Sequence, residues 1–125
     1  ELGRLALVAE EYDSAREHLD RLLDTRKSDA LALSARYLRC RVDVAAGAVK
    51  KAVPCLTQLR ADFPRSSRDQ EALALLVSIQ QQSGACPTAM ALLDEYVALY
   101  PAGPLARDAE VRRRQCRDPA RLRQP

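Results

Sequence analysis

Residues 84–101 read GACPTAMALLDEYVALYP, and residues 47–64 read GAVKKAVPCLTQLRADFP. The two stretches carry a glycine, an alanine, a large apolar residue and a proline at matching places, 37 residues apart. The same interval reaches further towards the N-terminus, where Ala15 and Leu19 precede Ala52 and Leu56 by 37 residues. A fixed period of roughly 20–50 residues is typical of a stacked repeat array. The 125-residue chain is therefore expected to consist of copies of one structural unit.

The apolar spacing within each copy predicts helices and no sheet. Leu73, Leu76 and Val77 lie one helical turn apart, and no stretch shows the sustained alternation of a strand. Gly47 and Gly84 are suited to the left-handed conformation that closes a helix. We therefore expect seven helices, at residues 1–9, 13–25, 29–46, 50–62, 68–83, 87–100 and 104–116.

Local signals refine three of the helix starts. Pro104 fits the first position of the last helix, where no amide partner is lost. Ser67 followed by Gln70 fits a capping box. Pro54 stands away from any boundary, so the fourth helix either begins late, near Lys51, or is bent at the proline.

Charge and hydropathy argue against two kinds of partner, the membrane interior and nucleic acid. No run of 18 or more apolar residues is present, so this segment is not expected to insert directly into a membrane. The net charge of +3 is concentrated in residues 107–125, which hold seven Arg against three acidic residues. The run Arg112-Arg113-Arg114 has no interleaved aromatic residue, so a nucleic-acid partner is not expected. The run is either a solvated helix face or an electrostatic docking patch.

The hairpin pattern resembles the tetratricopeptide repeat. Its turn and second helix match in residues 10–15 (EEYDSA), 47–52 (GAVKKA) and 84–89 (GACPTA). The resemblance implies an all-α solenoid of about three helix-turn-helix repeats over residues 1–117. The repeats are expected at about residues 1–27, 28–64 and 65–101, followed by a capping helix at 104–116 and a tail or linker at 118–125.

The chain departs from the usual form of that family in two ways. Its period is 37 rather than about 34 residues, and its first helices lack a Trp-Leu-Gly signature. Its links, Phe63-Pro64 and Tyr100-Pro101, are similar to those of a bacterial subgroup found in envelope proteins, such as a Tol-Pal-associated protein and a barrel-assembly lipoprotein. This likeness implies a periplasmic or envelope-associated location, with a cytoplasmic one as the alternative.

The resemblance also implies a non-enzymatic scaffold that binds a peptide or protein segment, either in a concave groove or at an edge, as part of a larger bacterial envelope protein. In this family the first helix of each repeat lines a concave groove. By register, the groove residues on this chain are Arg4, Tyr37, Arg41, Ser78, Gln81 and Val111. Tyr37 and Arg41 lie one turn apart and are either a binding anchor or an exposed Arg packed over a Tyr ring.

The four cysteines admit two interpretations. Cys40 lies seven residues before Gly47 and Cys55 lies eight after it, so the two face each other in an antiparallel hairpin. Cys86 opens the sixth helix and Cys116 closes the seventh. Disulfides Cys40–Cys55 and Cys86–Cys116 are thus sensible, and they would fit an oxidising compartment. The alternative is four buried free cysteines.

The sequence gives little support to catalysis or to metal binding. No short cysteine spacing suggests zinc, and no cofactor is expected. Cys86 at a helix start could have a lowered thiol pKa, but His18, the one histidine, lies two repeats away and offers no base.

Two further function classes stay open beside the scaffold. The first is a self-association module: because Glu1-Leu2-Gly3 already reads as helix, the array is expected to be cut at its start. Apolar residues there, including Leu2 and Leu5, could then form a homodimer. The second is a regulatory domain attached to a signalling protein.

Overall fold

The computed structural model describes residues 11–21 and 30–117, and within these ranges the fold is all-α, with no strand. Residues 11–21 are helical. They are followed by α2 (Ala30–Ala45), α3 (Val49–Asp62), α4 (Asp69–Gln82), α5 (Cys86–Leu99), α6 (Pro104–Arg107) and α7 (Ala109–Arg117). The chain divides into two compact units, residues 1–68 and residues 69–125, and each is described by itself. The expected first helix at 1–9 lies outside the described residues, and the single domain over 1–117 stays a prediction.

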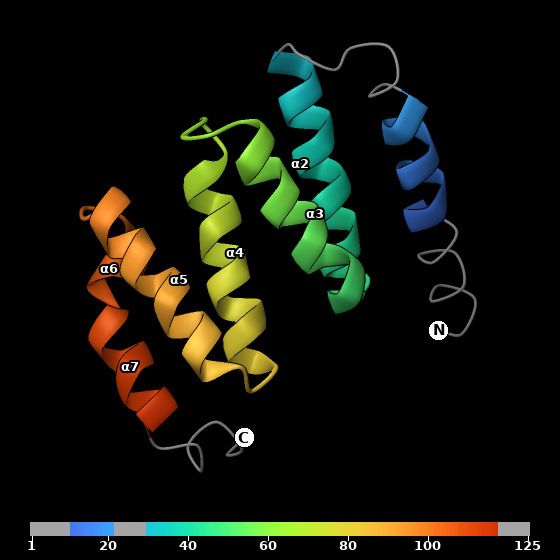
Figure 1. The fold of residues 1–125 in the computed structure, drawn as a ribbon. Helices are drawn as coiled ribbons and strands as arrows, with labels where there is room; N and C mark the ends of the chain where they lie inside the picture. The colour runs from blue at the N-terminus through green and yellow to red at the C-terminus, as the bar shows by residue number, and fades with distance from the viewer. Residues whose placement is uncertain (1–10, 22–29, 118–125) are drawn as a thin grey trace. The chain divides into compact units, whose positions relative to one another are not determined.

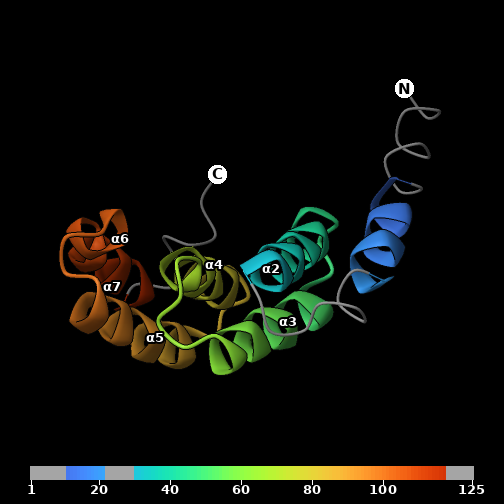
Figure 2. The same cartoon turned by 90° about the horizontal axis from the view of Figure 1, so that it is seen from above.

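In the first unit, α2 and α3 form a helical hairpin and lie side by side in both views (Figures 1 and 2). The turn is closed by Gly47, whose φ of 72° lies in the left-handed region. The N–H of Ala48 donates to the carbonyl of Asp43 at 2.9 Å, and the N–H of Gly47 donates to Val44 at 3.1 Å. These two bonds define a Schellman motif. The left-handed helix end predicted at Gly47 is confirmed.

The second unit repeats this construction with α4 and α5 (Figure 1). Gly84 has φ of 83°. The N–H of Ala85 donates to Gln80 at 2.9 Å, and the N–H of Gly84 donates to Gln81 at 3.1 Å. The same Schellman motif therefore recurs 37 residues later.

The 37-residue interval holds in the backbone geometry of both second helices. α3 and α5 each have 14 residues, with both ends offset by 37. The residues before them, Ala48 and Ala85, have φ,ψ of −85°,70° and −88°,62°. The residues after them, Phe63 and Tyr100, have φ,ψ of −128°,69° and −131°,63°. The repeat read from sequence is thus a repeat of local conformation.

Residues on the repeated positions form the core of each hairpin. Ala52 and Leu56 in α3 are fully buried, as are Ala89 and Leu93 in α5. Burying one leucine side chain is worth about 2 kcal/mol. In the second unit the core cluster contains Leu73, Val77, Leu93 and Tyr96 of the hairpin. It extends beyond the hairpin to Leu105 in α6 and Ala109 in α7.

The expected helix at 104–116 is wrong as a single helix. It is divided into α6 and α7 at Asp108, whose φ,ψ of −93°,3° leave the regular helix. Aspartate favours a helix cap over a helix interior, because its side chain competes for backbone donors. The carbonyl of Asp108 accepts the N–H of Arg112 at 3.0 Å and so starts the second piece.

Three other expectations about helix starts fail. The helix expected from residue 13 already includes residues 11 and 12. The late start near Lys51 is wrong, because α3 begins at Val49 and contains Pro54. The capping box is not formed, because Gln70 donates its amide to the Tyr96 hydroxyl at 2.9 Å instead. The proline is tolerated because Lys50, whose carbonyl loses its partner, lies on the exposed side.

Candidate interaction groove beside helix α2

An apolar groove lies in the first unit between the helical residues 11–21 and α2. Its volume is about 460 Å³, and it is lined by Tyr12, Ala15, His18, Leu19, Leu38, Arg41, Val42 and Ala45. These residues recur every three or four positions on each helix, so each helix contributes one face. Each lining row covers eight residues of helix, and its two end residues lie about 10 Å apart along the axis.

The groove wall includes a large apolar side chain that is about half exposed. Leu38 is 52% exposed, and Leu31, one heptad earlier on α2, is 46% exposed. Only Leu38 belongs to the groove lining. Single exposed leucines are ordinary, but a leucine that opens into an apolar hollow marks a surface able to bury more area.

Arg41 stands in the groove lining and is held by Tyr37. Its guanidinium donates to the Tyr37 hydroxyl at 3.3 Å, and its central carbon lies 5.9 Å from the ring centroid. Arg68 lies over the same ring at 4.9 Å. Tyr37 is only 3% exposed, whereas Arg41 is exposed. The pair therefore matches the alternative of an exposed Arg packed over a Tyr ring.

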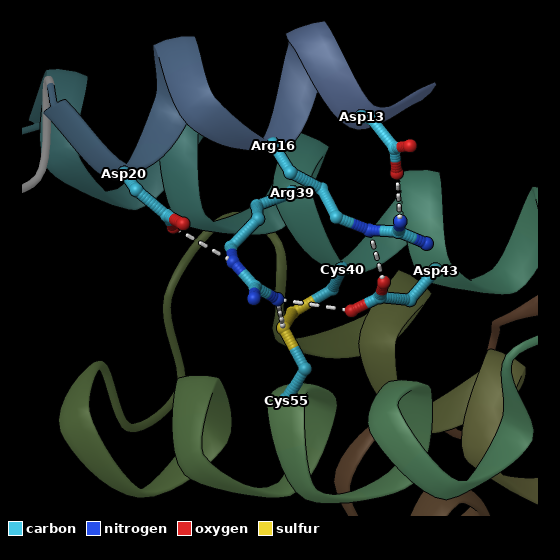
Figure 3. Close-up of polar contacts among 7 residues, drawn as sticks. All are labelled: Asp13, Arg16, Asp20, Arg39, Cys40, Asp43 and Cys55. Carbon is cyan, nitrogen blue, oxygen red and sulfur yellow. Dashed lines mark hydrogen bonds and ion pairs between the residues drawn. A yellow bond between two sulfur atoms is a disulfide. The ribbon is translucent and has the colours of Figure 1, made fainter. Parts of the chain in front are cut away.

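A cluster of ion pairs fixes one wall of the groove to the other. Asp43, with an exposure of 0%, accepts from Arg16 Nε at 2.8 Å and from Arg39 Nη1 at 2.9 Å. Arg39 also reaches Asp20 at 2.8 Å (Figure 3). Because Arg16 and Asp20 belong to residues 11–21 while Arg39 and Asp43 belong to α2, two of these pairs cross between the helices. They set the spacing of the two groove walls.

The cysteines lie in the pairing that the register predicts. Cys40 and Cys55 join α2 to α3 with a Cα–Cα separation of 5.5 Å, and Cys86 and Cys116 join α5 to α7 at 5.6 Å. Both are disulfides, and no cysteine is free. Arg39 Nη1 lies 3.7 Å from the Cys55 sulfur, so the first bridge adjoins the ion-pair cluster (Figure 3). Two such bridges are typical of a protein in an oxidising environment.

The other predicted groove residues do not gather around this groove. Arg4 lies outside the described residues. Gln81 is buried in the second unit, where its amide binds the Arg112 carbonyl and Gln115. Ser78 is half-buried, and Val111 on α7 is exposed. Tyr37 and Gln81 therefore cannot present their side chains as ligand contacts, because both are covered by the protein.

Sequence reasoning missed Leu38, Val42 and Asp43. The resemblance to the tetratricopeptide repeat places the ligand-binding face of α2 at Tyr37 and Arg41. Leu38 and Val42 each follow one of these residues and were therefore not selected. The signal for Asp43 was its place three residues after Cys40 on the buried face, where an acidic side chain needs cationic partners. Arg39, one turn before it, was the natural candidate.

Three absences hold for the residues that the structure describes. No group of three or more His, Cys, Asp or Glu side chains is placed to hold a metal ion. No helix in the described ranges has the length and apolar character needed to cross a membrane. Within those ranges, every buried side-chain nitrogen and oxygen has a hydrogen-bond partner.

Neither protein-family models nor curated protein sequences give a match to this chain. What can be said of its function therefore depends on the groove, its charges and the disulfides.

Proposed function

We propose that this chain is a non-enzymatic protein–protein interaction scaffold of the tetratricopeptide type, in which the groove beside α2 receives a segment of a partner protein. The observation that carries the proposal is the apolar groove with Leu38 half exposed at its wall. Docking an apolar segment there would remove apolar area from water, which is the main favourable term in protein association.

Rigid walls support the same function. The ion pairs Arg16–Asp43 and Arg39–Asp20 hold the two helices together, and the Cys40–Cys55 bridge fixes α2 to α3. A groove whose walls are held before binding loses less conformational entropy on binding.

A peptide selection tests the proposal. Peptides are selected from a random library against the full chain, and their affinities are measured for the wild type, Leu38→Gln and Leu31→Gln. Leu31→Gln is the matched control, because Leu31 is similarly exposed on α2 and does not line the groove. We expect Leu38→Gln to weaken binding about tenfold, which is the loss of one well-buried apolar contact, and Leu31→Gln to have little effect.

The proposal fails if the selected peptides bind Leu38→Gln as tightly as the wild type. It also fails if both leucine variants weaken binding equally, because binding would then follow the exposed side of α2 and not the groove.

Self-association is the second candidate, and the exposed leucines of α2 favour it. Leu31 and Leu38 are spaced by seven residues, as in a helix–helix seam. Sedimentation velocity over a wide concentration range tests it: a dimer that dissociates on Leu31→Gln as well as on Leu38→Gln supports this function in place of the scaffold.

We further propose a periplasmic or envelope-associated location. The two disulfides support it, because such bridges persist in the bacterial periplasm and are rare in the cytosol. Trapping the thiols of the native protein with an alkylating reagent directly in cells tests it: alkylation of all four cysteines before reduction contradicts an oxidising location.

A further inference from the structure

We propose that the partner segment docked beside α2 is an amphipathic α-helix whose apolar face carries an acidic residue at its edge, paired with Arg41. This inference rests on the proposed function and names the chemistry of the partner. It is carried by three features of the described residues: the two-helix shape of the groove, its apolar lining, and the absence of a carboxylate partner for Arg41.

The lining favours a helical occupant over an extended one. An extended peptide brings unpaired backbone N–H and C=O groups, and burying these without partners is costly. The lining offers few polar side chains to meet them, namely Tyr12, His18 and Arg41. A helix satisfies its backbone internally and presents only side chains to the groove.

The dimensions fit the same occupant. The lining rows Tyr12 to Leu19 and Leu38 to Ala45 each span about 10 Å, or about two helical turns. A helix laid along them would place apolar side chains at i, i+4 and i+7 into the groove, the usual spacing of helix-in-groove recognition. The volume of about 460 Å³ exceeds what one apolar side chain fills and is in the range of sites for larger ligands.

The charges of the lining select an acidic partner. The lining contains His18 and Arg41 and no carboxylate among the described residues. Three other arginines of this unit have carboxylate partners: Arg16 and Arg39 pair with Asp43, and Arg36 pairs with Asp62. Within residues 11–21 and 30–117, Arg41 pairs with no carboxylate, and the contact it makes is with the neutral Tyr37. Tyr37 thus positions the guanidinium without neutralising it, and the remaining N–H donors of Arg41 can reach a partner carboxylate.

The test uses three synthetic, alanine-based helical peptides of about 14 residues, titrated into the full chain. Each carries leucines at i, i+4 and i+7. They differ at i+3, on the edge of the leucine face, where one has Glu, one has Gln and one has Lys. We expect the Glu peptide to bind about fivefold more tightly than the Gln peptide, as for an exposed ion pair, and the Lys peptide to bind least.

Arg41→Gln should abolish the advantage of the Glu peptide and leave the affinity of the Gln peptide unchanged. Arg107→Gln is the matched control, because Arg107 is exposed and lies in the other unit. In the wild type the advantage should shrink as salt is raised from about 0.1 M to about 1 M, since salt screens exposed charges. Tyr37→Phe should reduce the advantage in part, because it removes the hydroxyl that positions Arg41 while keeping the ring.

The outcomes separate this inference from the proposed function. Peptides that bind through Leu38 with equal affinity for Glu and Gln would overturn the acidic partner and leave the scaffold standing. The inference is also overturned if the advantage of Glu persists in Arg41→Gln, or if no helical peptide binds while the library yields extended peptides sensitive to Leu38. Contacts in nuclear Overhauser spectra from Leu38 to residues 1–10, or to a second copy of the chain, would show a different occupant.

Discussion

At the scale of single residues, Asp43 is the unusual feature of the first unit. It is a fully buried carboxylate that meets two arginine side chains, Arg16 and Arg39, which remain partly exposed. A buried ion pair is weak support for stability as such, but removing one partner leaves a buried charge uncompensated. Through its ion pair with Arg16, Asp43 therefore fixes the position of the helix at 11–21 along α2.

Asp43→Ala should lower the free energy of unfolding by about 3 kcal/mol, because two guanidinium groups lose their charge-assisted hydrogen bonds to a buried carboxylate. Urea denaturation followed by circular dichroism measures this. Asp13→Ala is the control: the Asp13 side chain is largely exposed and pairs with Arg16, so its loss should cost less than about 1 kcal/mol. Equal effects of the two variants would contradict a special role for the buried carboxylate.

Asp62 makes the pH dependence of the α2–α3 hairpin testable. The hydrogen bond from Arg36, and after it the one from Gln58, hold the pKa of the Asp62 carboxyl below its ordinary value of 3.8. A lowered pKa in the folded state stabilises the protein above pH 3.8, and this contribution is lost as the pH falls through the lower, folded-state value. Asp62→Asn should therefore reduce stability at pH 7 and by less at pH values well below 3.8. Urea midpoints of both proteins at neutral and acidic pH measure the difference, and a constant difference at all pH values would contradict it.

At the scale of elements, the link after each hairpin has a backbone hydrogen bond at a matched position, and the second link also has a side-chain hydrogen bond. The N–H of Gly103 donates to the Tyr100 carbonyl at 2.9 Å, as the N–H of Ser66 does to Phe63 in the other unit. The Tyr100 hydroxyl donates to the carboxylate of Asp69, at the start of α4. The link after α5 is thus fixed by hydrogen bonds to both helices of its own unit.

Position 103 requires glycine because neighbouring side chains leave no room for a Cβ, and not because the backbone conformation demands glycine. A Cβ there would lie 2.3 Å from the Tyr96 hydroxyl oxygen and 2.6 Å from the Gln70 amide nitrogen. Gly103→Ala should destabilise the protein by about 2 kcal/mol through overpacking. Tyr96→Phe should recover part of that loss in the double variant, because it removes the nearest obstructing atom.

Gly84→Ala gives the contrasting case. A Cβ at Gly84 meets no atom within 4 Å, but φ of 83° is unfavourable for alanine. This variant should cost about 1 kcal/mol, and Tyr96→Phe should not recover it. Thermal or urea unfolding of the three single and two double variants measures both effects. Recovery by Tyr96→Phe in the Gly84→Ala background would contradict the steric explanation.

The elements themselves were predictable from sequence because their signals are local. Gly47 and Gly84 mark helix ends through backbone conformation, and the 37-residue period identifies Ala52, Leu56 and their counterparts as core. The break at Asp108 was missed because Leu105 and Ala109, on either side of it, continue the helical spacing. The groove was missed for a different reason. Which side of α2 stays uncovered depends on tertiary packing, and Leu38 looks like a core residue to any pattern based on hydropathy alone.

At the scale of the whole molecule, each unit holds one disulfide. Cys40–Cys55 spans 15 residues and Cys86–Cys116 spans 30. In the chain-entropy account, closing loops of these lengths restricts the unfolded chain and stabilises the fold by about 3 to 4 kcal/mol each. A small domain gains most from such bridges, because its hydrophobic core alone supplies little net stability. The bridges thus support the stability of both hairpins and, in the first unit, the wall of the groove.

A thiol count with and without reductant checks this arrangement. The unreduced protein, unfolded in guanidinium, should show no titratable thiol, and the reduced protein should show four. Reduction should lower the free energy of unfolding by about 3 kcal/mol or more per bridge.

The paired variant Cys40→Ser/Cys55→Ser should weaken Leu38-dependent peptide binding, since it releases α3 from the helix that carries the groove. Cys86→Ser/Cys116→Ser should reduce stability while leaving that binding intact, because its bridge lies in the other unit. Four thiols in the unreduced protein would contradict the pairing. If the first paired variant bound peptide as tightly as the wild type, the bridge would stabilise the chain without shaping its groove.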